Sequence, residues 1–164
     1  MTLDTRTLAN AASRLREGLD RYQRNIGDDQ LRDGLIQRFE FTYELAWKNL
    51  QRYIGENLAT PSEVRGMPFP DLIRTASEMS VVKSGWPAWR SFRDLRNKTS
   101  HTYEESAARD VVAGIPGFLE EVEYMLERFN RHSEHPDDRE ATIGRDREDV
   151  ESGLNDRTSG SDSP

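Results

Sequence analysis

Apolar residues recur at steps of three and four along four long segments of this chain, and this spacing constrains its fold more than any other feature. Such a spacing places the apolar side chains on one face of an α-helix. The segments cover approximately residues 8–26, 31–54, 88–100 and 106–131. No run of alternating apolar and polar residues is long enough to predict a β-sheet. The pattern therefore predicts an all-α protein whose amphipathic helices share one core.

Glycine and proline interrupt the chain between these segments. We expect Gly-Asp-Asp at residues 27–29 to end the first helix, and Gly-Glu-Asn at residues 55–57 to end the second. Several prolines follow, and a short extra helix is expected over residues 71–82. Pro116 should kink or weaken the last helix, because proline removes one backbone hydrogen bond. The predicted fold is an antiparallel four-helix bundle with a short extra helix.

The end of the chain differs in composition from the rest. Residues 132–164 contain ten Asp and Glu against four Arg, and so carry most of the net charge of −7. Only Ile143, Val150 and Leu154 are sizeable apolar side chains there. So few apolar groups cannot offset the entropy that is lost when a segment becomes ordered. We predict a helical domain over residues 1–131 and a disordered acidic tail over residues 132–164.

The composition also limits the class of protein. Mean hydropathy is −0.87, and no stretch approaches the roughly 20 apolar residues that a membrane span needs. The chain has no cysteine, which excludes disulfides and thiolate metal sites. Its first residues contain no apolar signal segment. We therefore expect a cytoplasmic protein that has no membrane partner.

A polar octet, Arg-Asn-Lys-Thr-Ser-His-Thr-Tyr at residues 96–103, follows the third apolar segment. It contains His101, the only histidine of the predicted helical domain. Cleavage of RNA without a metal ion requires a base, an acid and a positive charge beside the phosphorane. The imidazole of His101 can serve as acid or base, while Arg96 can bind a phosphate through two N–H groups.

Two further residues of the octet carry polar groups that suit such a site. Asn97 is a candidate for orienting the histidine or for holding a phosphate oxygen. Tyr103 has a hydroxyl that can donate to a phosphate or be modified itself.

Helix geometry restricts how Arg96 and His101 act together. Residues five apart on a regular α-helix point about 140° apart, so the two converge only if the helix ends or unwinds around residues 99–100. One chain also offers one histidine, whereas separate acid and base require two groups. A twofold homodimer with both octets at its interface supplies the second set. The alternative interpretation is a polar helix end whose cations interact with its own carbonyl groups.

The octet, the helix Ile-Gln-Arg-Phe-Glu-Phe-Thr-Tyr-Glu-Leu-Ala-Trp-Lys at residues 36–48 and the tryptophan-bearing segment before the octet resemble one known family. They are similar to the HEPN-type partners of minimal nucleotidyltransferases, first named nucleotidyltransferase substrate-binding proteins. The resemblance covers residues 8–130. It implies a helical homodimer, encoded beside a minimal nucleotidyltransferase, that acts on RNA as the toxin of a toxin–antitoxin module.

The resemblance also implies roles within the octet. Arg96 and His101 match the R-x4-6-H motif of a metal-independent endoribonuclease site at a dimer cleft, and Asn97 matches the polar residue often found after the arginine. In the subgroup that has Arg-x4-His-x-Tyr, the nucleotidyltransferase antitoxin silences the toxin by adding AMP to the tyrosine, here Tyr103. The alternative is a non-catalytic subunit that presents substrate to the nucleotidyltransferase. We expect no cofactor and no metal ion.

Two other charged patterns remain ambiguous. Glu40 and Glu44 are one helical turn apart, and without a nearby histidine we interpret them as a solvated face rather than a metal pair. Arg90, Arg93 and Arg96 recur every three residues. They form either a basic strip that leads to the octet or a set of surface ion pairs.

Overall fold

The computed structural model describes residues 4–58 and 61–134, and every regular element in these ranges is helical. A 3-10 turn, η1 (Thr99–His101), separates the last two α-helices. The α-helices are α1 (Arg6–Arg24), α2 (Asp29–Asn57), α3 (Pro61–Arg65), α4 (Phe69–Glu78), α5 (Trp86–Lys98) and α6 (Glu105–Glu134). The predicted all-α class is confirmed. None of the described helices is both long and apolar enough to span a membrane.

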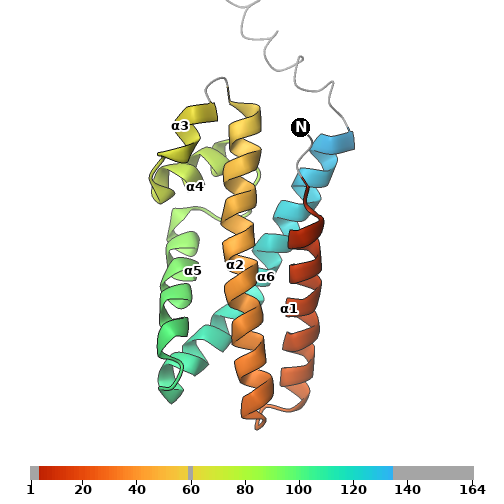
Figure 1. The fold of residues 1–164 in the computed structure, drawn as a ribbon, viewed down its shortest axis with the longest axis vertical. Helices are drawn as coiled ribbons and strands as arrows, with labels where there is room; N and C mark the ends of the chain where they lie inside the picture. Colours follow the sequence, from red (N-terminus) through yellow and green to blue (C-terminus); the bar gives the residue numbers. More distant parts are fainter. Residues whose placement is uncertain (1–3, 59–60, 135–164) are drawn as a thin grey trace, which may run out of the picture. The chain divides into compact units, whose positions relative to one another are not determined.

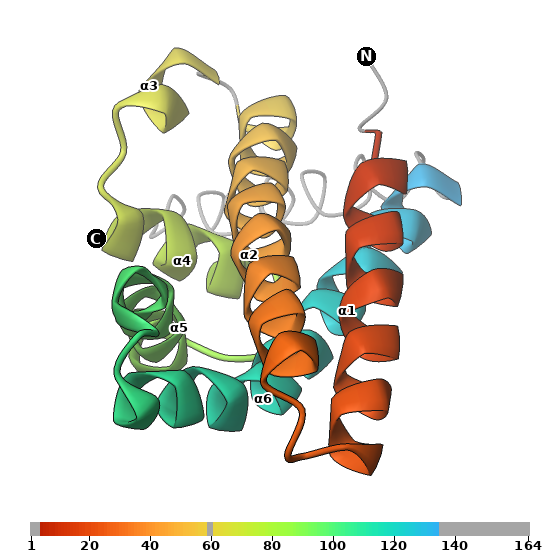
Figure 2. The ribbon, with the colours of Figure 1, turned by 60° about the horizontal axis from the view of Figure 1, so that its bottom comes forward.

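The four long helices, α1, α2, α5 and α6, alternate in direction, as Figure 1 shows. The short helices α3 and α4 lie in the connection between α2 and α5 (Figure 2). The predicted antiparallel four-helix bundle is therefore confirmed. The connection holds two short helices where the sequence predicted one. The additional helix begins at Pro61, a residue that suits a first turn because its missing N–H would have no partner there.

Helix boundaries follow local chemistry at some ends and packing at others. The Asp28 carboxylate accepts hydrogen bonds from the N–H groups of Gln30 and Leu31, at 3.0 and 3.1 Å, and so caps α2. The other end of α2 is Asn57, within the residues where the sequence predicted it, and the helix includes Gly55. Burial of an amphipathic face outweighs the weak helix propensity of one glycine.

The last helix is longer than the sequence predicted. It continues through Pro116 and ends at Glu134, so residues 132–134 are helical rather than part of a disordered tail. The remainder of the predicted tail, residues 135–164, lies outside the described residues.

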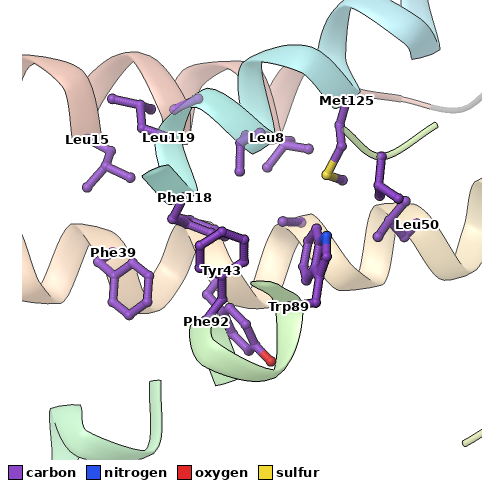
Figure 3. Close-up of a cluster of buried hydrophobic side chains, with 14 of the residues drawn as sticks. Leu8, Leu15, Phe39, Tyr43, Leu50, Trp89, Phe92, Phe118, Leu119 and Met125 are labelled. Carbon is purple, nitrogen blue, oxygen red and sulfur yellow. The ribbon is translucent and has the colours of Figure 1, made fainter. Parts of the chain in front are cut away.

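Apolar side chains from all four long helices meet in one core (Figure 3). Phe118 of α6 is fully buried, and its ring lies 5.1 Å from that of Phe39 on α2 and 5.4 Å from that of Phe92 on α5. Edge-to-face contacts of this kind contribute beyond simple burial. These ring contacts therefore fix α5 and α6 against α2. The other core residues labelled in Figure 3 are Leu8, Leu15, Tyr43, Leu50, Trp89, Leu119 and Met125.

A buried carboxylate joins α6 to the chain just before α5. Glu121 is 1% exposed. Its Oε1 accepts hydrogen bonds from the N–H of Lys83 at 2.8 Å, the N–H of Ser84 at 3.1 Å and the indole N–H of Trp89 at 3.2 Å. Burying a carboxylate is costly unless donors surround it. These three donors therefore fix the start of α5 relative to α6.

The start of α6 is also attached to α2. Arg32 Nη1 donates to both carboxylate oxygens of Glu105, at 2.8 and 2.9 Å. This hydrogen bond holds the pKa of the Glu105 carboxyl below its usual range, and the same partner raises the pKa of Arg32. The pair anchors the residues that directly follow Tyr103.

Near the octet, the Leu95 side chain of α5 lies against Gly114 of α6. A Cβ atom at Gly114 would overlap Cδ1 of Leu95 and lie 3.3 Å from its Cγ. Leu95 directly precedes Arg96 in α5. The packing of Leu95 against Gly114 is therefore directly adjacent to the arginine along α5.

Replacing Glu121 tests the three-donor contact. We expect Glu121→Ala to lower the free energy of unfolding by about 3 kcal/mol, because three buried donors lose their acceptor. Glu121→Gln keeps one acceptor oxygen and should lower it by about 1 kcal/mol. Urea unfolding at unchanged m-value measures both. An equal loss in the two variants would contradict the role given to the hydrogen bonds.

Two glycines of α6 provide a matched pair. Gly114→Ala should lower the free energy of unfolding by about 1–3 kcal/mol, because the new methyl group displaces Leu95. A Cβ at Gly117 meets nothing within 4 Å, so Gly117→Ala should raise stability by up to about 1 kcal/mol through helix propensity alone. Thermal unfolding of both variants checks the difference, and a gain at both positions would contradict it.

Candidate functional site

The octet lies where α5 changes into η1 and then turns into α6 (Figure 2). Arg96, Asn97 and Lys98 close α5, Thr99 begins the 3-10 turn and His101 ends it. Arg96 and His101 can converge only if the α-helix ends or unwinds around residues 99–100, and it does so at Thr99. His101 therefore lies on a tighter turn rather than on an extended loop.

Arg96 folds back toward the end of its own helix. Its Nη1 donates to the Thr99 hydroxyl at 3.0 Å, and that hydroxyl donates to the Arg96 carbonyl at 2.7 Å. Thr99 is buried, so this local contact is partly shielded from water. The Arg96 side chain keeps 28% of its surface exposed.

Two glutamates of α2 face the same guanidinium. Arg96 Nε lies 3.4 Å from Oε1 of Glu44, and Nη1 lies 4.0 Å from Oε1 of Glu40. Both carboxylates are partly exposed, as a solvated face would be, and they also form ion pairs with Arg96. Within residues 4–58 and 61–134, no group of three or more histidine, aspartate or glutamate residues could hold a metal ion.

Glu44 is itself held in place. Its second oxygen, Oε2, accepts a hydrogen bond from the indole N–H of Trp47 at 3.2 Å. Glu44 thus contacts a donor one turn away on α2 through one oxygen and the guanidinium on α5 through the other. Sequence reasoning missed this role, although the three-residue spacing of Glu44 and Trp47 on one helix face could have indicated their contact.

His101 and Tyr103 lie side by side on the surface. His101 Nδ1 is 3.3 Å from the Tyr103 hydroxyl, and the ring centroids are 5.9 Å apart at 75°. Which of the two groups donates depends on the tautomer of the imidazole. Tyr103 is 80% exposed, and His101 and Asn97 are exposed as well. All three side chains are open to a ligand or a partner.

The octet of one protomer does not bring all its functional groups together. Among the residues that the structure describes, no hydrogen bond joins Arg96 to His101. A groove of about 600 Å³ lies elsewhere, between α1 and α2, and its lining includes Arg14, Arg38 and Phe41 but no octet residue. His101 therefore stands on open surface in a single protomer.

The arginines of α5 do not form a uniform basic strip. The Arg93 guanidinium lies 5.1 Å above the Trp86 ring, Arg90 is exposed, and Arg96 pairs with carboxylates. Tyr43, beneath them, is 5% exposed. Burial raises the pKa of Tyr43 to about 12, so its hydroxyl stays protonated at neutral pH.

Chemically, the arrangement offers an exposed imidazole, an exposed phenol and an arginine whose direction is fixed from two sides. The imidazole is a suitable general acid or base. The guanidinium can stabilise negative charge on a phosphate. Within the described ranges no carboxylate pairs with His101, so its ring is able to face a substrate.

Comparison with known proteins gives consistent matches. Residues 3–131 match the family model for "nucleotidyltransferase substrate binding protein like". A protein of Haemophilus influenzae named probable ribonuclease HepT is 34% identical over 113 residues, which cover 69% of this chain and 77% of that protein.

Two solved structures share the fold. One from Haemophilus influenzae, described as the substrate binding domain of a nucleotidyltransferase, superposes with a TM-score of 0.73 at 31% identity, over 77% of this chain and 99% of that one. A protein of Thermus thermophilus gives a TM-score of 0.57 at 29% identity, over 74% of this chain and 98% of that one.

The family model covers most of the chain, and the curated relative exceeds 30% identity over two thirds of it. These matches agree with the resemblance inferred from the octet and the helix at residues 36–48. The chain belongs to the HEPN-type family of nucleotidyltransferase substrate-binding proteins.

Proposed function

We propose that this protein is the toxin of a two-gene toxin–antitoxin module, and that it is a metal-independent endoribonuclease active as a homodimer. The observation that carries the proposal is the exposed imidazole of His101 on the turn that directly follows the anchored Arg96. The name of the Haemophilus influenzae relative, probable ribonuclease HepT, supports it.

The reaction is an attack by a ribose on its own phosphate. The 2′-oxygen bonds to phosphorus while His101 of one protomer takes the 2′-hydroxyl proton. The bond from phosphorus to the 5′-oxygen breaks, and the partner's His101 supplies a proton to that oxygen. Arg96 stabilises the extra negative charge of the phosphorane, and Asn97 contributes a hydrogen bond. The products carry a 2′,3′-cyclic phosphate and a 5′-hydroxyl.

Two copies are needed because one chain carries one histidine in the octet. A twofold axis beside the octet places two imidazoles and two guanidiniums around a single phosphate. The exposure of His101 in the single protomer supports this arrangement, since a catalytic group in a dimer cleft must first be accessible.

The antitoxin in this proposal is a minimal nucleotidyltransferase that modifies Tyr103. The phenolic oxygen attacks the α-phosphorus of ATP, an oxygen–phosphorus bond forms, and pyrophosphate leaves. A base of the transferase takes the phenolic proton. The resulting AMP group would lie beside His101, where its charge and bulk exclude RNA. The 80% exposure of Tyr103 supports this step.

A second candidate function is a non-catalytic subunit that presents substrate to a nucleotidyltransferase. The description of the Haemophilus influenzae structure as a substrate binding domain of a nucleotidyltransferase favours it. In this function the octet binds a substrate or a partner and cleaves nothing.

Replacing His101 separates the two functions. We expect His101→Ala to lower the rate of RNA cleavage, measured in the presence of a chelator, by about 10³-fold and to abolish growth inhibition. Its unfolding temperature should stay unchanged because the side chain is exposed. Ser100→Ala, at an exposed neighbouring position, is the control and should cleave like the wild type. A wild-type protein that binds the transferase but cuts no RNA would favour the second function.

Replacing Tyr103 tests the silencing step. After co-expression with the neighbouring nucleotidyltransferase, the intact mass of the wild type should increase by one or more AMP groups. Tyr103→Phe should keep its mass and inhibit growth even in the presence of the transferase. Tyr22→Phe, in α1 and outside the octet, should be modified and silenced normally. Equal modification of Tyr103→Phe would contradict the assignment.

A further inference from the structure

We propose that Glu44 is a positioning residue for Arg96, and that its carboxylate, held by Trp47, sets the direction in which the guanidinium meets a phosphate. This inference rests on the proposed ribonuclease function and extends it to a residue of α2.

The contacts form a continuous chain between two helices. The Trp47 indole donates to Glu44 Oε2 at 3.2 Å, and Glu44 Oε1 lies 3.4 Å from Arg96 Nε. On the other side of the guanidinium, Nη1 donates to the Thr99 hydroxyl at 3.0 Å. Arg96 is thus held by its own turn and by a separate helix.

The contact with Glu44 restricts the orientation of the Arg96 guanidinium. Arg96 Nε is buried and has no hydrogen-bond acceptor in the described part of the chain, so Glu44 Oε1 is an ion-pair partner at a distance slightly too long for a good hydrogen bond. Such contacts often shorten when a substrate binds. A small shift of the guanidinium toward the carboxylate completes the bond.

The negative charge of Glu44 does not increase the affinity of the protein for RNA. A carboxylate beside a phosphate-binding arginine repels the phosphate and cancels part of the attraction. An arginine without a partner would bind RNA more strongly but would sample several rotamers. Glu44 therefore lowers attraction for the substrate while it restricts the direction of the planar guanidinium, and direction matters for bidentate contact with a phosphate.

Glu40 cannot take the same role. Its Oε1 lies 4.0 Å from Arg96 Nη1, at the limit of an ion pair, and that nitrogen already donates to Thr99. No described donor orients the Glu40 carboxylate, whereas Trp47 orients that of Glu44. The inference therefore distinguishes two glutamates one turn apart.

Steady-state cleavage of an RNA oligonucleotide by the full-length homodimer tests the inference. Glu44→Gln keeps an acceptor for Trp47 but removes the negative charge. We expect kcat to fall roughly 10- to 100-fold, because a misdirected catalytic group costs rate. KM should stay the same or decrease, since a charge that repels phosphate is gone. Trp47→Phe should lower kcat less and in the same direction.

Two variants serve as controls on α2. Glu56→Gln makes the same change at an exposed position of the same helix and should leave both constants unchanged. Glu40→Gln should lower kcat clearly less than Glu44→Gln. An equal loss at Glu40, or a rise in KM at Glu44 with kcat unchanged, would overturn the inference.

A double-mutant cycle distinguishes positioning from loss of structure. If Glu44 acts through the guanidinium fork, Glu44→Gln should have little further effect in an Arg96→Lys background, because lysine has no fork to direct. Independent effects that multiply in the double variant would overturn the inference.

A readout without catalysis separates this inference from the proposed function. The Nε–Hε resonance of Arg96 in the NMR spectrum should be sharp and shifted in the wild type, and averaged toward free arginine in Glu44→Gln. If the wild type cleaves no RNA, the ribonuclease proposal fails while this measurement still reports on Glu44. A resonance that is identical in both proteins would overturn the positioning role itself.

Discussion

The position of α5 depends above all on one buried carboxylate. Glu121 binds two backbone N–H groups and one indole N–H at the start of α5, while Phe118, three residues earlier on α6, packs against the ring of Phe92. Together they fix where α5 begins along α6 and which face of α5 packs against α6. The octet lies at the other end of α5. The contacts of Glu121 at the start of the helix therefore also determine where the octet side chains lie.

Around the octet, structural and chemical groups occupy different sides. The side toward the core contains the buried Thr99 and the half-buried Leu95, which lies against Gly114. The exposed side contains the imidazole and phenol of His101 and Tyr103, which contact each other rather than the core. Arg96 lies between the two sides, with its charge partly balanced by α2. This separation leaves the side chains of His101 and Tyr103 accessible while the backbone that holds them is fixed by packing.

Much of the fold was predictable, because helical periodicity is a strong signal in long amphipathic segments. A break near Thr99 was only the condition under which Arg96 and His101 could converge, and α5 does end there. Local propensity could not show that α6 extends to Glu134 or that a separate helix begins at Pro61, because the packing of distant segments decides such boundaries. The contacts of Glu44 with Arg96 and of Glu121 with the start of α5 depend on which helices are neighbours, and spacing within one segment does not contain that information.

The salt bridge between Arg32 and Glu105 has a consequence for the proposed modification of Tyr103. The pair attaches the chain two residues beyond the phenol to another helix. The surface around the phenol therefore depends on the folded arrangement of α2 and α6. A transferase that modifies Tyr103, as proposed, would have to bind the folded surface that α2 and α6 form there. A short synthetic peptide with the same sequence would lack that folded surface and should be a poor acceptor of AMP.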